Sequence, residues 1–254
     1  MPTQTIHAID GLHIAYDIQG YGIPLILLHG FSNDRRMWHR YGVISALEED
    51  FTVITLDLRG CGQSQGSGDA GAYKVDFYLN DILRVADACE VETFAVWGWS
   101  FGGTLACHLS THTPRLTRVV AAGTYFGQIF TSQWVKQRLV TTIPLALAKH
   151  AGELDHLQLS DDARRFAEET DFDVMIARIE ALQDWPTVDP EEVRRPMLLY
   201  SGTEDRVVLN NLDQQHAAIQ AAGIDLLVYD GLDHVGLVSD LAAVYPNIYK
   251  FLTT

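Results

Sequence analysis

The stretch Phe94–Gly103, FAVWGWSFGG, decides the fold. An apolar run of strand length leads into the pattern G-x-S-x-G at residues 98–102, and helix-forming residues follow it. Glycines flank the serine because the chain turns sharply there and neighbouring backbone comes too close for a Cβ atom. Such a turn lifts the Ser100 hydroxyl off the strand end and points the Phe101 amide at the reacting oxygen. The stretch therefore predicts a nucleophilic serine between a strand and a helix.

The rest of the chain alternates between strand patterns and helical patterns. Apolar runs such as Pro24–Leu28 are typical of strands buried on both faces, whereas Tyr73–Cys89 has the apolar spacing of a helix. This alternation indicates βαβ units in a doubly wound, mostly parallel sheet of eight strands flanked by helices. The expected strands are Thr5–Ile9, Leu12–Ile18, Pro24–Leu28, Phe51–Leu56, Thr93–Trp97, Leu116–Ala121, Pro196–Tyr200 and Asp225–Tyr229, and further helices are expected at Thr104–His112 and near the C-terminus.

One segment interrupts this rhythm. Between about Gly127 and Pro196 the sequence has helical patterns and no convincing strand. Roughly 70 residues of helix between two strands exceed an ordinary connection, so we expect an inserted cap. The predicted division is a core at 1–126 and 186–254 with a helical cap at 127–185. Because the insertion leaves beside the serine strand, we expect it to cover Ser100 and to determine substrate choice.

A nucleophilic serine requires a base, and the base requires an acid that fixes its tautomer. His234 directly follows the last expected strand, and Asp205 follows the strand before it. Loops after parallel strands gather at one edge of the sheet, which is also the edge that carries Ser100. The chain order Ser, Asp, His also fits hydrolytic triads. The sequence predicts the catalytic set Ser100, Asp205 and His234, with Glu204 as the alternative acid.

Five motifs in this order resemble the α/β-hydrolase superfamily along nearly the whole chain. The resemblance implies an α/β-hydrolase fold with the inserted cap, and a serine esterase or lactonase with the triad above. Besides G-x-S-x-G, the motifs are LLHGF (Leu27–Phe31), similar to the family's oxyanion loop, LDLRGCGQS (Leu56–Ser64), similar to its D-x-R-G-x-G-x-S segment, and GTEDRVV (Gly202–Val208) and GLDHVGLV (Gly231–Val238), similar to its acid and histidine segments.

The resemblance also implies particular roles and exposes two departures. The backbone amides of Phe31 and Phe101 are implied to form the oxyanion hole, while His29 is expected to shape its loop. Cys61 stands where bulky residues are common in relatives, and we interpret it as a small buried hydrophobe. Asp233 stands before the histidine where glycine is usual.

Composition excludes several classes of partner. The net charge of −15 argues against a nucleic-acid or anionic-membrane partner, since both require a basic face. The three cysteines fit no zinc pattern, and the first residues lack the features of a signal peptide, so a cytoplasmic location is expected. No metal and no cofactor are expected. The expected partner is a small-molecule substrate, and the chain is expected to be a monomer or a homodimer.

The sequence therefore predicts a hydrolase of carboxylic esters or lactones that works through an acyl-enzyme. The same triad leaves open carbon–carbon bond hydrolysis, amide hydrolysis and cofactor-free peracid formation. A small-molecule receptor of the same fold is the alternative from another class. We expect the substrate to be small and mainly apolar. The candidate pocket residues are Trp38, Trp99, Tyr125, Phe126, Trp134 and Met175.

Overall fold

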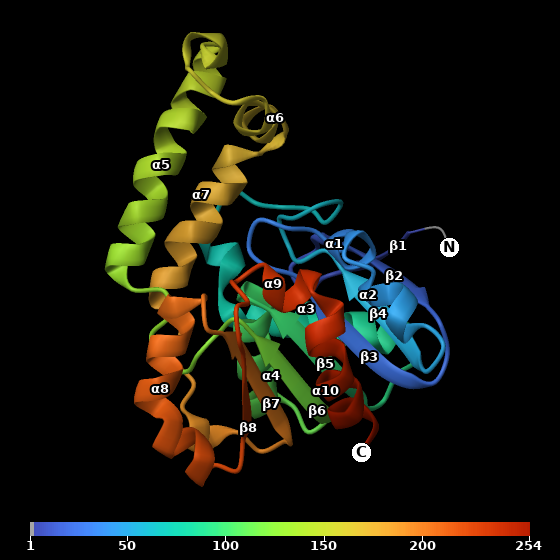
Figure 1. The fold of residues 1–254 in the computed structure, drawn as a ribbon. Helices are drawn as coiled ribbons and strands as arrows, with labels where there is room; N and C mark the ends of the chain where they lie inside the picture. The colour runs from blue at the N-terminus through green and yellow to red at the C-terminus, as the bar shows by residue number, and fades with distance from the viewer. Residues whose placement is uncertain (1–2) are drawn as a thin grey trace.

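The computed structural model describes residues 3–254 and contains one eight-stranded sheet (Figure 1). Strand β2 runs antiparallel to its neighbours β1 and β4, and every other pair is parallel. The expected mostly parallel sheet is thus confirmed. In the order β1-β2-β4-β3-β5-β6-β7-β8, the strands are β1 (Gln4–His7), β2 (His13–Gln19), β4 (Phe51–Leu56), β3 (Ile23–Leu28), β5 (Phe94–Trp99), β6 (Leu116–Ala122), β7 (Met197–Gly202) and β8 (Asp225–Tyr229).

Helices cover both faces of this sheet. One face carries α3 (Val75–Ala88), α4 (Phe101–His112) and α8 (Arg206–Ala221). The other carries four helices: α1 (Met37–Arg40), α2 (Val43–Leu47), α9 (Gly236–Ser239) and α10 (Leu241–Thr253). Short 3₁₀ turns are η1 (Ala70–Tyr73), η2 (Leu154–His156), η3 (Leu182–Asp184) and η4 (Pro190–Glu192).

The two cores follow from the period of two along each strand. In β3, Leu25 and Leu27 pack against the α1, α2 and α10 side, whereas Ile26 and Leu28 pack against the α3 and α4 side. All four side chains are completely buried. Burial of one such side chain stabilises the fold by about 1.5–3 kcal/mol, which explains why these strands are apolar throughout.

Helix α4 begins earlier than the sequence indicated. The expected helix started at Thr104, but α4 begins at Phe101 and includes Gly102 and Gly103. These glycines are needed for close packing: a Cβ atom on Gly102 would lie 2.0 Å from the carbonyl oxygen of Leu28. Because both glycines were interpreted as part of the turn, the first turn of the helix was not predicted.

The segment between β6 and β7 is helical, with α5 (Ser132–Ala151), α6 (Asp161–Glu169) and α7 (Phe172–Ala181). In Figure 1, α5 and α7 lie side by side and extend away from the sheet, with α6 near their far end. This part has its own small core around Ala146, Ala167 and Phe172, and α7 also packs on η1. Across residues 3–254, no helix combines the length and apolar character needed to cross a membrane.

Candidate active site

Ser100 occupies a strained turn between β5 and α4. Its backbone has φ 56° and ψ −117°, a conformation that costs a residue with a side chain about 1–3 kcal/mol. Gly98 makes the turn possible, because a Cβ atom there would lie 2.0 Å from the Gly102 carbonyl oxygen. The Ser100 amide donates to the carbonyl of Ala122 on β6 at 2.8 Å, which fixes the turn to the sheet.

Ser100, His234 and Asp205 form one hydrogen-bonded chain. The Ser100 Oγ lies 2.9 Å from His234 Nε2, and His234 Nδ1 lies 2.6 Å from Asp205 Oδ2. A carboxylate only accepts hydrogen bonds, so Nδ1 carries the proton and Nε2 is free to accept from the serine hydroxyl. The Asp205 side chain is 9% exposed and that of His234 is 38% exposed, so the acid is shielded while the base remains open to solvent.

The alternative acid lies elsewhere. The side chain of Glu204 is half exposed and meets Arg206 at 3.4 Å. The Glu204 amide donates to the carbonyl of Leu232, which ties the loop after β7 to the loop that carries the histidine. The geometry therefore brings Asp205 against His234 and leaves Glu204 at the surface.

Two residues fix the position of the His234 ring. Trp99 Nε1 donates to the His234 carbonyl at 2.9 Å, and the two rings lie 5.2 Å apart. On the other side is Gly123, whose φ is +61°; a Cβ atom there would lie 2.9 Å from His234 Cε1. Gly123 was not among the predicted site residues, although a glycine two positions after an expected strand was an available signal.

Phe31 and Phe101, whose backbone amides are the predicted oxyanion donors, pack against each other. Their rings meet edge to face at 5.4 Å, and Phe101 begins α4, whose N-terminus favours negative charge. In the described part of the chain, neither amide has a hydrogen-bond acceptor. Both are therefore available to a negatively charged oxygen.

His29 shapes the loop that carries Phe31. Its Nδ1 donates to the Gly30 carbonyl at 2.7 Å, and its Nε2 accepts from the Leu58 amide at 3.0 Å. Complete burial lowers the pKa of His29 to about 4, so the ring is neutral near pH 7. This neutral tautomer matches the two hydrogen bonds.

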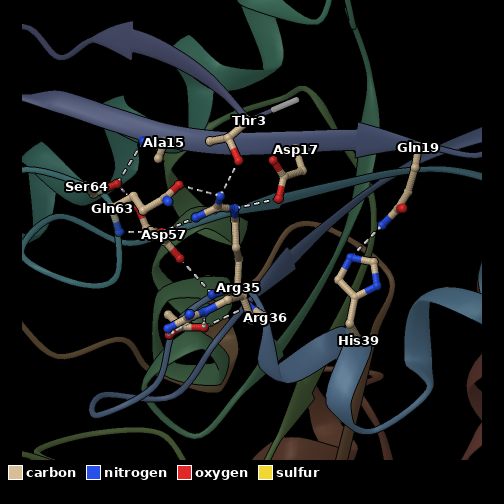
Figure 2. Close-up of polar contacts among 11 residues, drawn as sticks. Thr3, Ala15, Asp17, Gln19, Arg35, Arg36, His39, Asp57, Gln63 and Ser64 are labelled. Atoms are coloured by element: carbon tan, nitrogen blue, oxygen red, sulfur yellow. Dashed lines mark hydrogen bonds and ion pairs between the residues drawn. The ribbon is translucent and has the colours of Figure 1, made fainter. Parts of the chain in front are cut away.

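A buried ion-pair network anchors the other end of the same loop (Figure 2). The Arg35 guanidinium donates to Asp17 at 2.6 Å, to Gln63 at 2.9 Å and also to Asp57. Asp57 in turn accepts from the backbone amides of Arg35 and Gln63. The network thus joins the loop after β3 to β2 and to the loop after β4. Sequence reasoning did not identify Arg35, because nothing local distinguishes it from its exposed neighbour Arg36.

Five of the six predicted pocket residues fall into three groups. Trp99 contacts His234, and Trp134 lies 6.2 Å from the Phe31 ring. Met175 lines a cavity of about 120 Å³ beside Phe31, between α5 and α7. Tyr125 and Phe126 line a small cavity of about 20 Å³ behind α4.

The prediction that Trp38 lines the substrate pocket is wrong. This residue is completely buried, and its ring lies 5.6 Å from that of Trp97 in the core beneath the sheet. It therefore does not line a pocket above Ser100. An aromatic residue shortly after a strand satisfies the pattern of either location, so the sequence could not separate them.

The helical segment contacts Phe31 and Phe101. Trp134 and Phe130 pack around Phe31 and Phe101, with ring separations between 5.2 and 6.2 Å. The imidazole of His234 nevertheless keeps its 38% exposure. The segment thus lies beside the triad and does not seal it.

The remaining titratable groups offer little further chemistry. Cys61 is buried, and burial raises the pKa of its thiol, so it is a poor nucleophile. Among residues 3–254 there is no group of three or more His, Cys, Asp or Glu side chains placed to hold a metal ion.

Comparison with known proteins identifies relatives of this arrangement. The profile of the α/β-hydrolase fold family matches residues 23–141. An uncharacterised protein of Mycobacterium tuberculosis is 31% identical over 115 residues, 45% of this chain and 33% of that protein, so the chain matches only about a third of that relative's length. A putative carbamate hydrolase of Caulobacter segnis is 26% identical over 98% of both chains.

Solved structures share the whole fold. An esterase from Exiguobacterium antarcticum superposes with a TM-score of 0.80 at 20% identity and covers 100% of both chains. Proteins that match by sequence or by fold also bear the names of epoxide hydrolases and an enol-lactonase, so they differ in the bond that they cleave. The sheet order, the flanking helices and the sequence match agree on one assignment. The chain has the α/β-hydrolase fold, and its residues 23–141 match the profile of that fold family.

Proposed function

We propose that this protein is a serine hydrolase that cleaves carboxylic esters or lactones of small, mainly apolar substrates. The observation that carries the proposal is the hydrogen-bonded chain from Asp205 through His234 to Ser100. The backbone amides of Phe31 and Phe101, which have no acceptor within residues 3–254, would bind the oxyanion. The constellation supplies a nucleophile, a base oriented by an acid, and stabilisation of developing negative charge.

The reaction follows from these positions. Ser100 Oγ attacks the carbonyl carbon while His234 Nε2 takes its proton, and Asp205 stabilises the resulting imidazolium. The amides of Phe31 and Phe101 stabilise the oxyanion. His234 then returns the proton to the leaving alcohol, and an acyl-Ser100 remains. Water activated by the same histidine hydrolyses this acyl-enzyme, which restores the serine.

The surroundings of the serine support apolar acyl groups. The rings of Phe31, Phe101, Phe130 and Trp134 contact one another on the oxyanion side. Such rings favour apolar carbon chains over charged groups, because burying a charge without a partner is costly. Since this cluster is packed, we expect short acyl chains to be preferred.

Cleavage of a carbon–nitrogen bond is the second candidate. The Caulobacter relative, named as a putative carbamate hydrolase, matches almost the whole chain. Carbamates and amides pass through the same tetrahedral intermediate, and His234 would protonate a leaving nitrogen instead of oxygen. Carbon–carbon bond hydrolysis and peracid formation are further reactions that the same triad could perform.

Epoxide hydrolysis fits this site poorly. Attack of Ser100 on an epoxide carbon would leave an ether, which has no carbonyl for water to attack. A role as a receptor is also disfavoured, since ligand binding alone does not require Ser100, His234 and Asp205 to be hydrogen-bonded in series.

A substrate panel combined with active-site labelling tests the proposal. We expect turnover of 4-nitrophenyl acetate and butyrate, and labelling of Ser100 by a fluorophosphonate probe. Ser100→Ala should retain the fold and lose about 10⁴–10⁶-fold in kcat, because the triad acts as a unit. Normal hydrolysis by this variant would refute the assignment. Higher kcat/KM for aryl carbamates than for matched esters would favour the second candidate.

A further inference from the structure

Arg178 is a buried cation on α7 that lacks an anionic partner. The residue is 3% exposed, and its guanidinium stays protonated at any pH at which proteins fold. In the described range 3–254, no Asp or Glu side chain forms an ion pair with it. Burying an unpaired charge is costly, so the other contacts of the guanidinium must offset that cost.

Those contacts converge on Phe31. Arg178 Nη2 donates to the Phe31 carbonyl at 2.8 Å, and the guanidinium carbon lies 4.3 Å from the centroid of the Phe31 ring. Nη1 reaches the Gly60 carbonyl at 3.5 Å. The fit is close, because a Cβ atom on Gly60 would lie 3.0 Å from Arg178 Cδ. The Arg178 side chain thus contacts both the backbone carbonyl and the ring of Phe31.

Phe31 also supplies an amide to the oxyanion site. A carbonyl and a ring that are both held leave the residue little freedom to rotate, so the direction of its N–H is fixed as well. The far end of the same loop is anchored independently by Arg35 and Asp57. The Gly30 carbonyl, which shares its peptide plane with the Phe31 N–H, accepts from His29 Nδ1 and from the Asn33 amide. Arg178 is therefore a second anchor, on the other side of the Phe31 Cα atom, and it is the one that the helical segment contributes.

We propose that Arg178 is a positioning residue that holds the Phe31 amide toward the developing oxyanion. The inference rests on the proposed acyl transfer by Ser100. It makes α7 part of the catalytic arrangement, in addition to any contact that the helical segment makes with substrate.

Three variants test this role: Arg178→Met, Arg178→Lys and, as the matched control, Arg164→Met. Arg164 belongs to the same helical segment and also donates to backbone carbonyls, those of Leu154 and Leu157. It pairs in addition with the exposed Asp155 and has no hydrogen bond to Phe31. Lysine is informative because Arg178 Nε makes no hydrogen bond within residues 3–254, so the contacts to restore lie at the end of the side chain.

The readouts are kcat and KM with 4-nitrophenyl acetate, the rate of Ser100 labelling by a fluorophosphonate, and the Tm. We expect Arg178→Met to lower kcat and the labelling rate about 10–100-fold with little change in KM, since a misplaced oxyanion donor weakens only the transition state. Arg178→Lys should recover part of this loss, and Arg164→Met should match the wild type.

The outcomes separate the two proposals. If Arg178→Met lowered Tm but kept wild-type kcat and labelling well below its Tm, the role would be structural and the inference wrong. A rise in KM alone would assign Arg178 to substrate binding and would also overturn it. If the wild-type protein neither turned over esters nor reacted at Ser100, the proposed function itself would fail, and the inference with it.

Discussion

Gly123 offers a sharp test of how precisely His234 is placed, because the added methyl group of Gly123→Ala would meet the imidazole. An ideal Cβ atom at this position lies 2.9 Å from His234 Cε1 and 3.1 Å from Nδ1. Carbon atoms in contact prefer about 3.5–4.0 Å, so the ring would have to move by roughly 0.6–1.1 Å. That ring is held at 2.6 Å by Asp205 and at 2.9 Å by Ser100, so a displacement of this size distorts both hydrogen bonds.

Backbone strain must be separated from this clash. Gly123 has φ +61°, where any side chain costs about 1–2 kcal/mol. Gly223 has φ +70° and nothing within 4 Å of its ideal Cβ atom. Gly223→Ala therefore carries the same strain without the clash and is the matched control.

We expect Gly223→Ala to lose about 1–2 kcal/mol of unfolding free energy in urea titrations, and Gly123→Ala to lose at least as much because the clash adds to the strain. Only Gly123→Ala should lose activity, by about 10²-fold in kcat, the cost typical of a catalytic group displaced by about 1 Å. Steady-state kinetics with 4-nitrophenyl acetate measure this loss. Wild-type kcat in Gly123→Ala, or an equal loss in Gly223→Ala, would refute the reasoning.

Three further predictions concern the acid, the buried ion pair and the pH dependence of stability. Asp205→Asn should lower kcat by about 10⁴-fold in ester assays, while Glu204→Gln should change it less than about twofold. Asp57→Ala should lower the unfolding free energy by about 3–5 kcal/mol, whereas Arg36→Ala, at an exposed pair, should lower it by less than about 1 kcal/mol, both by urea titration. Burial lowers the pKa of His108 to about 4, so the unfolded chain binds the proton first and stability falls on acidification from about pH 6.5 to 4. His108→Phe should reduce that slope by about 1.4 kcal/mol per pH unit; an unchanged slope would contradict the shift.

The sequence predicted those features that local pattern and sheet topology determine. The strand, glycine turn and helix around Ser100 are contiguous, so their order alone specified the turn. Asp205 and His234 lie 105 and 134 residues beyond Ser100. They were nevertheless predicted together, because each follows a parallel strand and such loops share one edge of the sheet. The sheet topology thus predicts that these residues, although distant in the sequence, lie close together.

Features that depend on packing between distant segments were not predicted. The contact between Arg178 and Phe31 joins residues 147 positions apart, and that between Arg35 and Asp57 joins residues 22 apart. Sequence periodicity does not predict such a pair, because a buried arginine cannot be distinguished from an exposed one in the sequence. The prediction that Trp38 lines the pocket was wrong for the same reason. Its hydrophobicity indicates burial but does not indicate on which side of the sheet the side chain is buried.

These unpredicted contacts bear on how the helical segment influences the reaction. The loop that carries Phe31 is held by core residues at Arg35 and by α7 at Phe31. If α7 fixes the direction of a catalytic amide, then substitutions along α7 change kcat even where they do not touch substrate. Exchanging residues 127–185 with those of a relative would then alter the chemical step together with specificity, unless the arginine and its contacts to Phe31 and Gly60 were kept. On the proposed role of Arg178, transition-state stabilisation therefore depends on a side chain from the same segment that is expected to determine substrate choice.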